Sequence, residues 1–262
     1  MEGHKQPEQI KKPFLRVTLM RHEEPFYKNE GHDLTDNGAA GARETGKSIA
    51  EIIDPEDELY LLSSPSRRTR GTLALVAEGA GLEATPRRSI KALRMGEIRD
   101  MGRFKERIKE LGDGQGKEGI ARDQYTDPVY ENDPSFIEPN SSKKERLYRS
   151  FEYLLRWLDS HQEADGARVI AVSHFEIITH LIDDVFGIET IGRYNAPSFG
   201  EKIEIEGYHT ESEDKVLLKV TYNEHQKVVH FNRSERSIEI EEELWWLTGY
   251  KLPSGCSPIN SW

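Results

Sequence analysis

Short apolar runs alternate with stretches of helical periodicity along the first two thirds of the chain. The apolar runs predict strands at residues 15–20, 59–62, 89–93 and 168–172. Small and apolar residues at helical spacing predict helices at residues 35–53, 68–80, 147–158 and 177–186. Because strands and helices alternate, we expect a mostly parallel central sheet with helices on both faces.

The pattern changes to period two from Lys202 onward. Residues 202–206 (KIEIE) and 216–222 (VLLKVTY) alternate between apolar and polar side chains, and residues 227–231 (KVVHF) form a third short run. This spacing predicts an antiparallel meander. The expected fold class is therefore α/β: one domain with a three-layer α/β/α core, a mostly parallel sheet and a β-rich C-terminal extension.

Three segments lie outside this pattern. Residues 1–13 are polar and predict a flexible N-terminus, which leaves the main domain at residues 14–231. Residues 103–145 lack periodicity and are rich in glycine and proline, so we expect a lid insertion there. The tail, residues 232–262, is acidic at first and then carries Trp245 and Trp246, which we expect to pack against the domain.

The charge balance and the single cysteine narrow the function classes. The 262 residues carry a formal net charge of -11, which disfavours nonspecific binding to nucleic acids or anionic membranes. Cys256 is the one cysteine, so neither an internal disulfide nor a cysteine-built metal site is expected. The polar N-terminus does not resemble a secretory signal, and no apolar run reaches the ~18 residues of a membrane helix. We expect a cytoplasmic protein.

Polar side chains follow three of the predicted strands. Arg21 and His22 come after the first strand, the segment from Ser63 to Arg68 follows the second, and Ser173-His174 follows residues 168–172. The carboxyl ends of parallel strands meet at one edge of a sheet, where ligands bind. We therefore expect two histidines and at least two arginines to converge there.

These segments resemble the histidine phosphatase (phosphoglycerate mutase-like) superfamily. The resemblance spans roughly residues 14–206 and rests on ordered motifs: Leu19-Met20-Arg21-His22, Leu34-Thr35 with Gly38, Ser63-Ser64-Pro65 with Arg68 and Thr72, Glu97 before Gly102, Val172-Ser173-His174, and Asn195-Ala196-Pro197-Ser198. It implies that His22 is a nucleophile that carries a phosphohistidine. It further implies that Arg21, Arg68 and His174 surround the phosphate, that Glu97 is the proton donor, and that neither a metal nor a cofactor takes part.

Several positions depart from the family pattern. Glu23 replaces the glycine after the first histidine, and Pro25 to Lys28 stand where the mutases have asparagine and tryptophan. Phe175 replaces the glycine after His174. We expect Glu23 and Lys28 to help bind the substrate, and we expect that substrate to differ from 2,3-bisphosphoglycerate.

The expected function is a cofactor-independent phosphatase that hydrolyses a small phosphorylated metabolite. Two alternatives stay open: a phosphoglycerate-type mutase, and an inactive relative that binds a phosphorylated ligand or a protein partner. Asp100 and Glu176 are rivals of Glu97 for the proton-donor role. The sequence predicts a small phosphorylated substrate as partner, without nucleic acid or membrane, and leaves the oligomeric state open.

Overall fold

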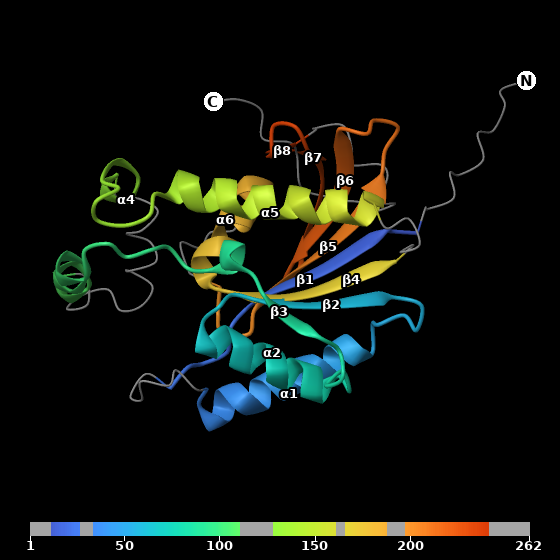
Figure 1. The fold of residues 1–262 in the computed structure, drawn as a ribbon, viewed down its shortest axis with the longest axis horizontal. Helices are drawn as coiled ribbons and strands as arrows, with labels where there is room; N and C mark the ends of the chain where they lie inside the picture. The colour runs from blue at the N-terminus through green and yellow to red at the C-terminus, as the bar shows by residue number, and fades with distance from the viewer. Residues whose placement is uncertain (1–11, 27–33, 111–127, 161–165, 188–196, 241–262) are drawn as a thin grey trace, which may run out of the picture.

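An eight-stranded sheet runs through the computed structural model (Figure 1). The structure describes residues 12–26, 34–110, 128–160, 166–187 and 197–240. The strands are β1 (Leu15–Arg21), β2 (Glu58–Ser63), β3 (Arg87–Ser89), β4 (Ala167–Ser173), β5 (Lys202–His209), β6 (Lys215–Tyr222), β7 (His225–Asn232) and β8 (Ser237–Glu239). The helices are α1 (Asp36–Ala50), α2 (Arg67–Gly79), α4 (Val129–Asn132), α5 (Asn140–Ser160) and α6 (Phe175–Phe186), with a short 3-10 helix at Lys91–Leu93.

The strand order is β3-β2-β4-β1-β5-β6-β7-β8. The pairs among β3, β2, β4 and β1 are parallel, and every pair from β1–β5 onward is antiparallel. This confirms the α/β fold class, with a parallel half followed by an antiparallel meander. β8 was not predicted; it adds a three-residue strand to β7 beyond the run at residues 227–231.

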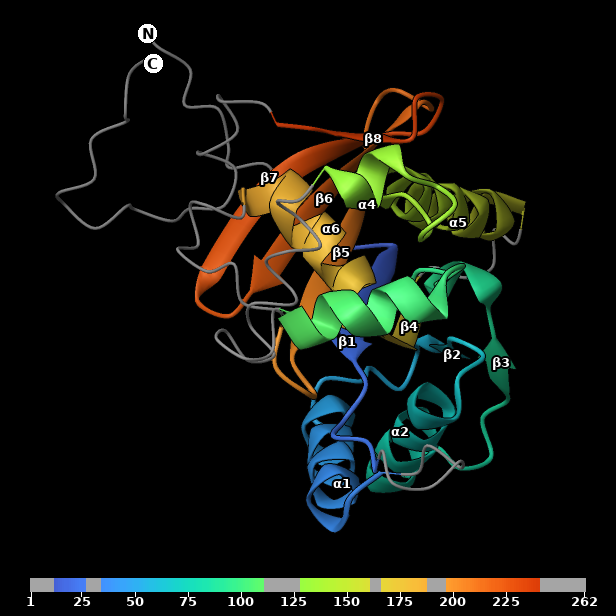
Figure 2. The ribbon, with the colours of Figure 1, turned by 90° about the vertical axis from the view of Figure 1, so that its left-hand side faces the viewer.

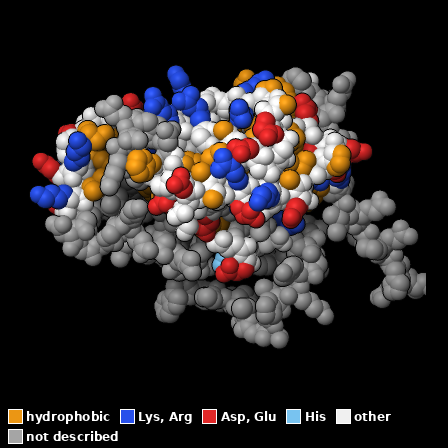
Figure 3. Space-filling view, turned by 90° about the horizontal axis from the view of Figure 1, so that it is seen from below, with side chains coloured by type: hydrophobic (Ala, Val, Ile, Leu, Met, Phe, Trp, Pro, Cys, Tyr) orange, Lys and Arg blue, Asp and Glu red, His pale blue; other side chains and the backbone are white. Residues whose placement is uncertain are grey.

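Helices α1 and α2 cover one face of the sheet (Figure 1). They pack backbone against backbone, because a Cβ atom at Gly46 would lie 2.2 Å from the carbonyl oxygen of Val76 and one at Gly79 would lie 2.1 Å from that of Arg43. Glycine is the residue that permits so close an approach. Acidic and basic side chains are interspersed over the side of the molecule on which these helices lie (Figure 3).

Helices α5 and α6 lie on the opposite face, which completes the three layers (Figure 1). The largest apolar core forms there, with Leu147 and Leu155 from α5 and Ile177 from α6. β4 is buried over its whole length because sheet neighbours and helices surround it. This burial explains why its sequence is continuously apolar rather than alternating.

The segment after β2 differs from the prediction. The strand predicted at residues 89–93 ends at Ser89, and residues 91–93 form the 3-10 helix instead. β2 itself ends at Ser63, which pairs with Ser89, so the ladder has no further partner there. A side chain from α5 holds the next residues: Nη1 of Arg146 donates to the carbonyl oxygens of Lys91, Ala92 and Arg94 at 3.2, 2.6 and 3.0 Å.

Helices occupy most of the described parts of the predicted lid, apart from residues 133–139. Residues 101–110 are helical, α4 follows, and α5 begins at Asn140, well before the predicted start at Leu147. The first two turns of α5 are polar, and Lys143 is only 1% exposed there, so apolar periodicity could not reveal them. Helical residues 101–110 project beyond the ends of β1 and β4 and lie in front of them in Figure 2.

Candidate functional site

Three parallel strands bring their carboxyl ends together. Arg21 at the end of β1 pairs in register with Ser173 at the end of β4, and Ser63 at the end of β2 pairs with Val172. The next residues continue this alignment, because the backbone nitrogen of His22 donates to Ser173 and that of Ser64 donates to Val172, both at 3.0 Å. The sheet therefore fixes the backbone positions of the polar residues that follow it.

Two helices start at the same edge. Ser66 caps α2 and its hydroxyl accepts from the backbone nitrogen of Thr69, which places Arg68 in the first turn. His174 occupies the N-cap position of α6. A helix N-terminus carries partial positive charge and unpaired N–H groups, so both helix ends favour an anion. We refer to Arg21, His22, Ser64, Arg68 and His174 as the strand-end cluster.

His22 is held in one tautomer. Its Nδ1 lies 2.8 Å from the carbonyl oxygen of Glu23, and its Nε2 lies 2.9 Å from Nε of Arg68. A carbonyl oxygen only accepts and a guanidinium nitrogen only donates, so Nδ1 carries the hydrogen and Nε2 carries the lone pair. Burial, together with the charges of Arg68 and Arg21, lowers the pKa of His22 to about 3. The imidazole is therefore neutral near pH 7, and the lone pair of its Nε2 accepts from Arg68.

His174 is held in the opposite tautomer. Its Nδ1 lies 3.1 Å from Nη2 of Arg68, and its Nε2 lies 2.8 Å from the hydroxyl of Ser64. Since Arg68 donates, Nδ1 accepts and Nε2 donates to Ser64. Burial and the charge of Arg68 lower the pKa of His174 to about 2. Arg68 thus bridges both imidazoles, whose ring centres lie 5.3 Å apart.

Arg21 joins the cluster from β1. Its guanidinium lies over the ring of Phe199, 4.1 Å from the centroid, and 5.5 Å from that of Phe175. It also donates to the carbonyl oxygen of Pro197. Two aromatic faces and a carbonyl therefore hold a cation beside His22. Of the predicted site residues, the structure brings Arg21, His22, Arg68 and His174 together.

Glu23 contributes mainly through its backbone. Its carbonyl oxygen fixes His22, and its backbone nitrogen donates to the hydroxyl of Thr72 at 3.0 Å. The carboxylate is buried between two glycines: Oε1 would lie 2.2 Å from a Cβ atom at Gly200 and 3.0 Å from one at Gly41. Burial raises the pKa of Glu23, and the charge of Glu24 adds to this effect.

Glu97 lies apart from the cluster. Its side chain is 48% exposed and faces Arg94 and Arg99 at 3.7 and 3.6 Å. None of its contacts with described residues involves His22, Arg68 or His174. The thioether of Met95 lies 3.1 Å from Nη2 of Arg68 instead. The role of Glu97 as proton donor therefore stays a prediction from the family resemblance.

The two rivals of Glu97 differ sharply. Asp100 is exposed, and its carboxylate accepts from the backbone nitrogen of Arg103 at 3.0 Å, so it caps the helix at residues 101–110. Glu176 is 4% exposed in the first turn of α6, close enough for its charge to interact with Arg68 and Arg21. Burial raises the pKa of Glu176, although the charge of buried Lys143 opposes that shift.

Some predicted site residues fall outside the described part of the chain, and some functional ones were not predicted. Lys28, proposed for substrate binding, lies outside the described residues, as do Asn195 and Ala196. Ser64 belongs to a recognised motif, but its contact with His174 joins positions far apart in sequence. Phe199, which directly follows the Asn-Ala-Pro-Ser motif, gave no separate signal.

Comparison with known proteins agrees with this geometry. The sequence profile of the histidine phosphatase superfamily (branch 1) matches residues 17–198. The chain therefore belongs to the histidine phosphatase superfamily. A search of curated protein sequences returned no match.

Solved structures show that the fold is shared. A phosphoglycerate mutase from Bacillus anthracis superposes with a TM-score of 0.57 at 16% identity, covering 85% of this chain and 95% of the other. A mycobacterial glucosyl-3-phosphoglycerate phosphatase superposes with a TM-score of 0.56 at 18% identity, covering 79% of this chain and 97% of the other.

Two further features bear on cofactors and membranes. Within the described ranges, no three His, Cys, Asp or Glu side chains cluster in a way that could hold a metal ion. In the same part of the chain, no helix is long and apolar enough to cross a membrane.

Proposed function

We propose that this protein is a cofactor-independent phosphatase that hydrolyses small phosphate monoesters through a phosphohistidine on His22. The observation that carries the proposal is the fixed tautomer of His22, in which Nε2 holds the lone pair and faces Arg68 at 2.9 Å. In a neutral imidazole the lone pair of Nε2 is not protonated, so it can attack phosphorus. The neighbouring guanidinium attracts the phosphate dianion.

The first step transfers the phosphoryl group to His22. Nε2 forms a bond to phosphorus while the bond from phosphorus to the ester oxygen breaks, and the leaving oxygen takes a proton from a carboxyl group. Arg21, Arg68 and the N-termini of α2 and α6 stabilise the charge on the equatorial oxygens. A phosphate next to His174 would raise the pKa of that imidazole, so that it becomes a further donor.

The second step releases the phosphate. Water attacks phosphorus as the bond to Nε2 breaks, and the carboxylate left by the first step takes the proton from water. The family resemblance assigns this carboxyl group to Glu97. In the structure Glu97 is exposed, so this step requires its side chain to turn from Arg94 and Arg99 toward the cluster. Catalytic contacts are often completed only when substrate is bound.

A quenched single-turnover experiment tests the proposal. A labelled aryl phosphate should leave base-stable, acid-labile label on the peptide that contains His22, and His22→Ala should abolish it. The matched control is His225→Ala, which removes an exposed histidine of β7. Label on His174 or on a serine would contradict the assignment. The measurement is made with and without exhaustive chelation, and a requirement for a divalent ion would overturn the cofactor-independent mechanism.

An inactive phosphate-binding relative is the second candidate. The observation that favours it is the position of Met95 against Arg68, where no described carboxylate contacts His22. An inactive protein would bind inorganic phosphate, and Arg68→Ala would weaken that binding, yet no label would appear on His22. Release of phosphate from an aryl phosphate by the original chain, lost in His22→Ala, decides for the phosphatase. Transfer between two phosphoglycerates would instead indicate a mutase.

A further inference from the structure

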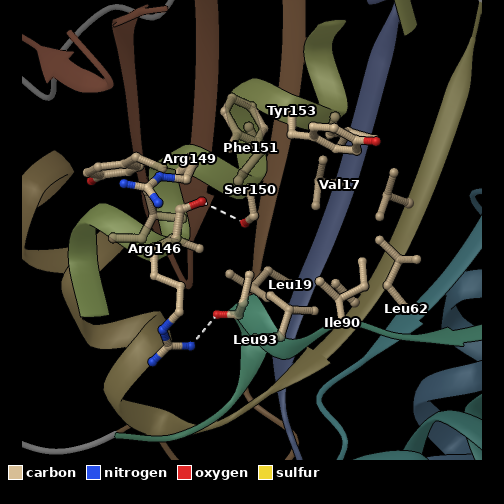
Figure 4. A pocket seen from close by; sticks show the side chains of 18 of the residues that line it. Val17, Leu19, Leu62, Ile90, Leu93, Arg146, Arg149, Ser150, Phe151 and Tyr153 are labelled. Atoms are coloured by element: carbon tan, nitrogen blue, oxygen red, sulfur yellow. Dashed lines mark hydrogen bonds between the residues drawn. The ribbon is translucent and has the colours of Figure 1, made fainter. Parts of the chain in front are cut away.

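An open groove of about 800 Å³ lies between α5 and the face of the sheet (Figure 4). Val17, Leu19 and Leu62 form its sheet side, and Phe151 and Tyr153 project from α5. The groove is separate from the strand-end cluster, since none of the five cluster residues lines it. Its lining belongs to the main apolar core, which is incompletely covered at this point.

Several large side chains in this groove stay partly exposed. Leu62 and Trp157 are half-buried, and Tyr153 at the rim is 71% exposed. Soluble proteins seldom leave a continuous apolar surface of this kind uncovered, and where they do it usually marks a binding site. The groove therefore has the character of a docking surface, and none of the described residues fills it.

The last described residues of the chain lie next to this groove. Ile238 of β8 is one of the residues that line it, and the last described residue is Ile240. Another 22 residues, 241–262, follow in the sequence. An extended chain spans at most about 3.3–3.6 Å per residue, so residues 244–250 lie within roughly 35 Å of Ile240 along any path. A tail that starts at the edge of the groove can reach all of it.

The sequence of the tail complements the groove in polarity. The tail begins with three glutamates, residues 241–243, and continues with Leu244, Trp245, Trp246 and Leu247. The apolar residues that follow the glutamates match the apolar lining of the groove.

We propose that the groove binds the C-terminal tail of the same chain, with Trp245 and Trp246 inserted between α5 and the sheet. The aromatic rings would cover the exposed parts of Leu62 and Trp157. Tryptophan suits this role because it buries a large apolar area and pays a small cost in conformational freedom. The proposal does not depend on the chemistry at His22.

Cysteine cross-linking in the full chain tests the docking. In the Cys256→Ser background, Trp246→Cys is combined with Tyr153→Cys at the rim of the groove. The matched control combines Trp246→Cys with Glu44→Cys, which is equally exposed on α1, across the sheet. Docking raises the effective concentration of the two thiols, so the first pair should form an intramolecular disulfide on the order of tenfold faster or more.

Three outcomes would overturn the proposal. Equal rates in the two variants would show that the tail does not prefer the groove. A disulfide that forms only between molecules would show that the occupant is a second copy. An apolar small molecule that copurifies and slows cross-linking would show that the groove binds another ligand.

A second measurement avoids the engineered cysteines. Trp245→Ser together with Trp246→Ser should expose Tyr153 and Trp157 to oxidative footprinting, whereas Trp262→Ser, at the far end of the same tail, should not. Unchanged protection of Trp157 in the double variant, in a protein that remains folded by circular dichroism, would contradict the proposal.

Discussion

The strand-end cluster and the segment that carries Glu97 are built in different ways. His22 and His174 are 3% and 1% exposed, and parallel strands, a helix cap and Arg68 fix them. Glu97 is 48% exposed and contacts two arginines at the surface. Exposed ion pairs contribute only about 0–1 kcal/mol, so little holds Glu97 where it is. The sheet therefore fixes the residues that we propose to bind the phosphate, whereas the proposed proton donation depends on a side chain that can move.

The largest expected effect tests the proposed role of the exposed Glu97 as proton donor. Glu97→Gln should slow single-turnover hydrolysis of an alkyl phosphate by about 10²–10⁴-fold, because an alkoxide leaves poorly without a proton. Phosphoenzyme formation from a nitrophenyl phosphate should suffer much less, since nitrophenolate leaves readily. Rapid-quench rates with both substrates measure the difference.

Glu176→Gln is the matched comparison for Glu97→Gln. If the buried carboxyl group of Glu176 is the donor, its variant shows the selective loss on the alkyl substrate and Glu97→Gln does not. Equal losses on both substrates in Glu97→Gln would also rule out Glu97 as the acid of the first step. The first result would mean that the proton donor is a buried carboxyl group that already lies beside the strand-end cluster.

The next largest effect tests the preformed strand-end cluster. Arg68→Lys should lower kcat/KM by about 10²–10³-fold, the usual cost of losing one oriented donor. Lysine keeps the charge, but its donors radiate from one nitrogen and cannot reproduce the planar guanidinium, whose Nε and Nη2 reach His22 and His174 separately. Arg67→Lys, one position earlier and exposed, is the control. Similar losses in both variants would mean that charge near the site, rather than the fork of Arg68, matters.

The contrast between the strand-end cluster and the Glu97 segment also explains which features the sequence could predict. Arg21, His22 and His174 follow apolar strands directly, so the register of a parallel sheet was enough to bring them together. Residues 91–94 are held by Arg146, more than fifty residues later in the chain, whose guanidinium donates to the carbonyl groups of Lys91, Ala92 and Arg94. Local periodicity carries no information about such a contact, so the strand predicted at residues 89–93 was partly wrong.

The start of α5 was missed for a related reason. Its first two turns are polar, and Lys143 is buried beside the carboxylates of Glu176 and Glu138 rather than among apolar side chains. A pattern search that takes buried positions to be apolar cannot find such a helix start. The contact between Ser64 and His174 likewise arises only from the tertiary fold.

A third prediction concerns acid stability. Burial lowers the pKa of His22 and His180 to about 3 and that of His174 to about 2. The unfolded chain takes up these protons below about pH 6.5 while the folded protein does not, so stability is lost as the pH falls. Each histidine should cost about 2 kcal/mol at pH 5 relative to pH 8. Raised pKa values let Glu23 and Glu176 bind protons in the folded state first, which opposes the loss.

His180 isolates this effect because it lies outside the strand-end cluster. Denaturant unfolding of His180→Gln between pH 8 and pH 5 should lose about 2 kcal/mol less than the original chain. The exposed His225→Gln is the control and should follow the original chain. Parallel curves for the original chain and His180→Gln would show that His180 is not buried in its neutral form.

The smallest expected effect compares two helix caps on the same face of the sheet. Thr35 caps α1, where its hydroxyl accepts from the backbone nitrogen of Gly38 at 3.0 Å. Ser66 caps α2 and also bonds to the hydroxyl of Ser64, at 3.2 Å, which in turn contacts His174. Thr35→Ala and Ser66→Ala should each lower the free energy of unfolding by about 1 kcal/mol. Only Ser66→Ala should also lower kcat/KM, by roughly 2- to 10-fold, the worth of one hydrogen bond. Equal activity in the two variants would show that the Ser66–Ser64–His174 chain does not position the imidazole.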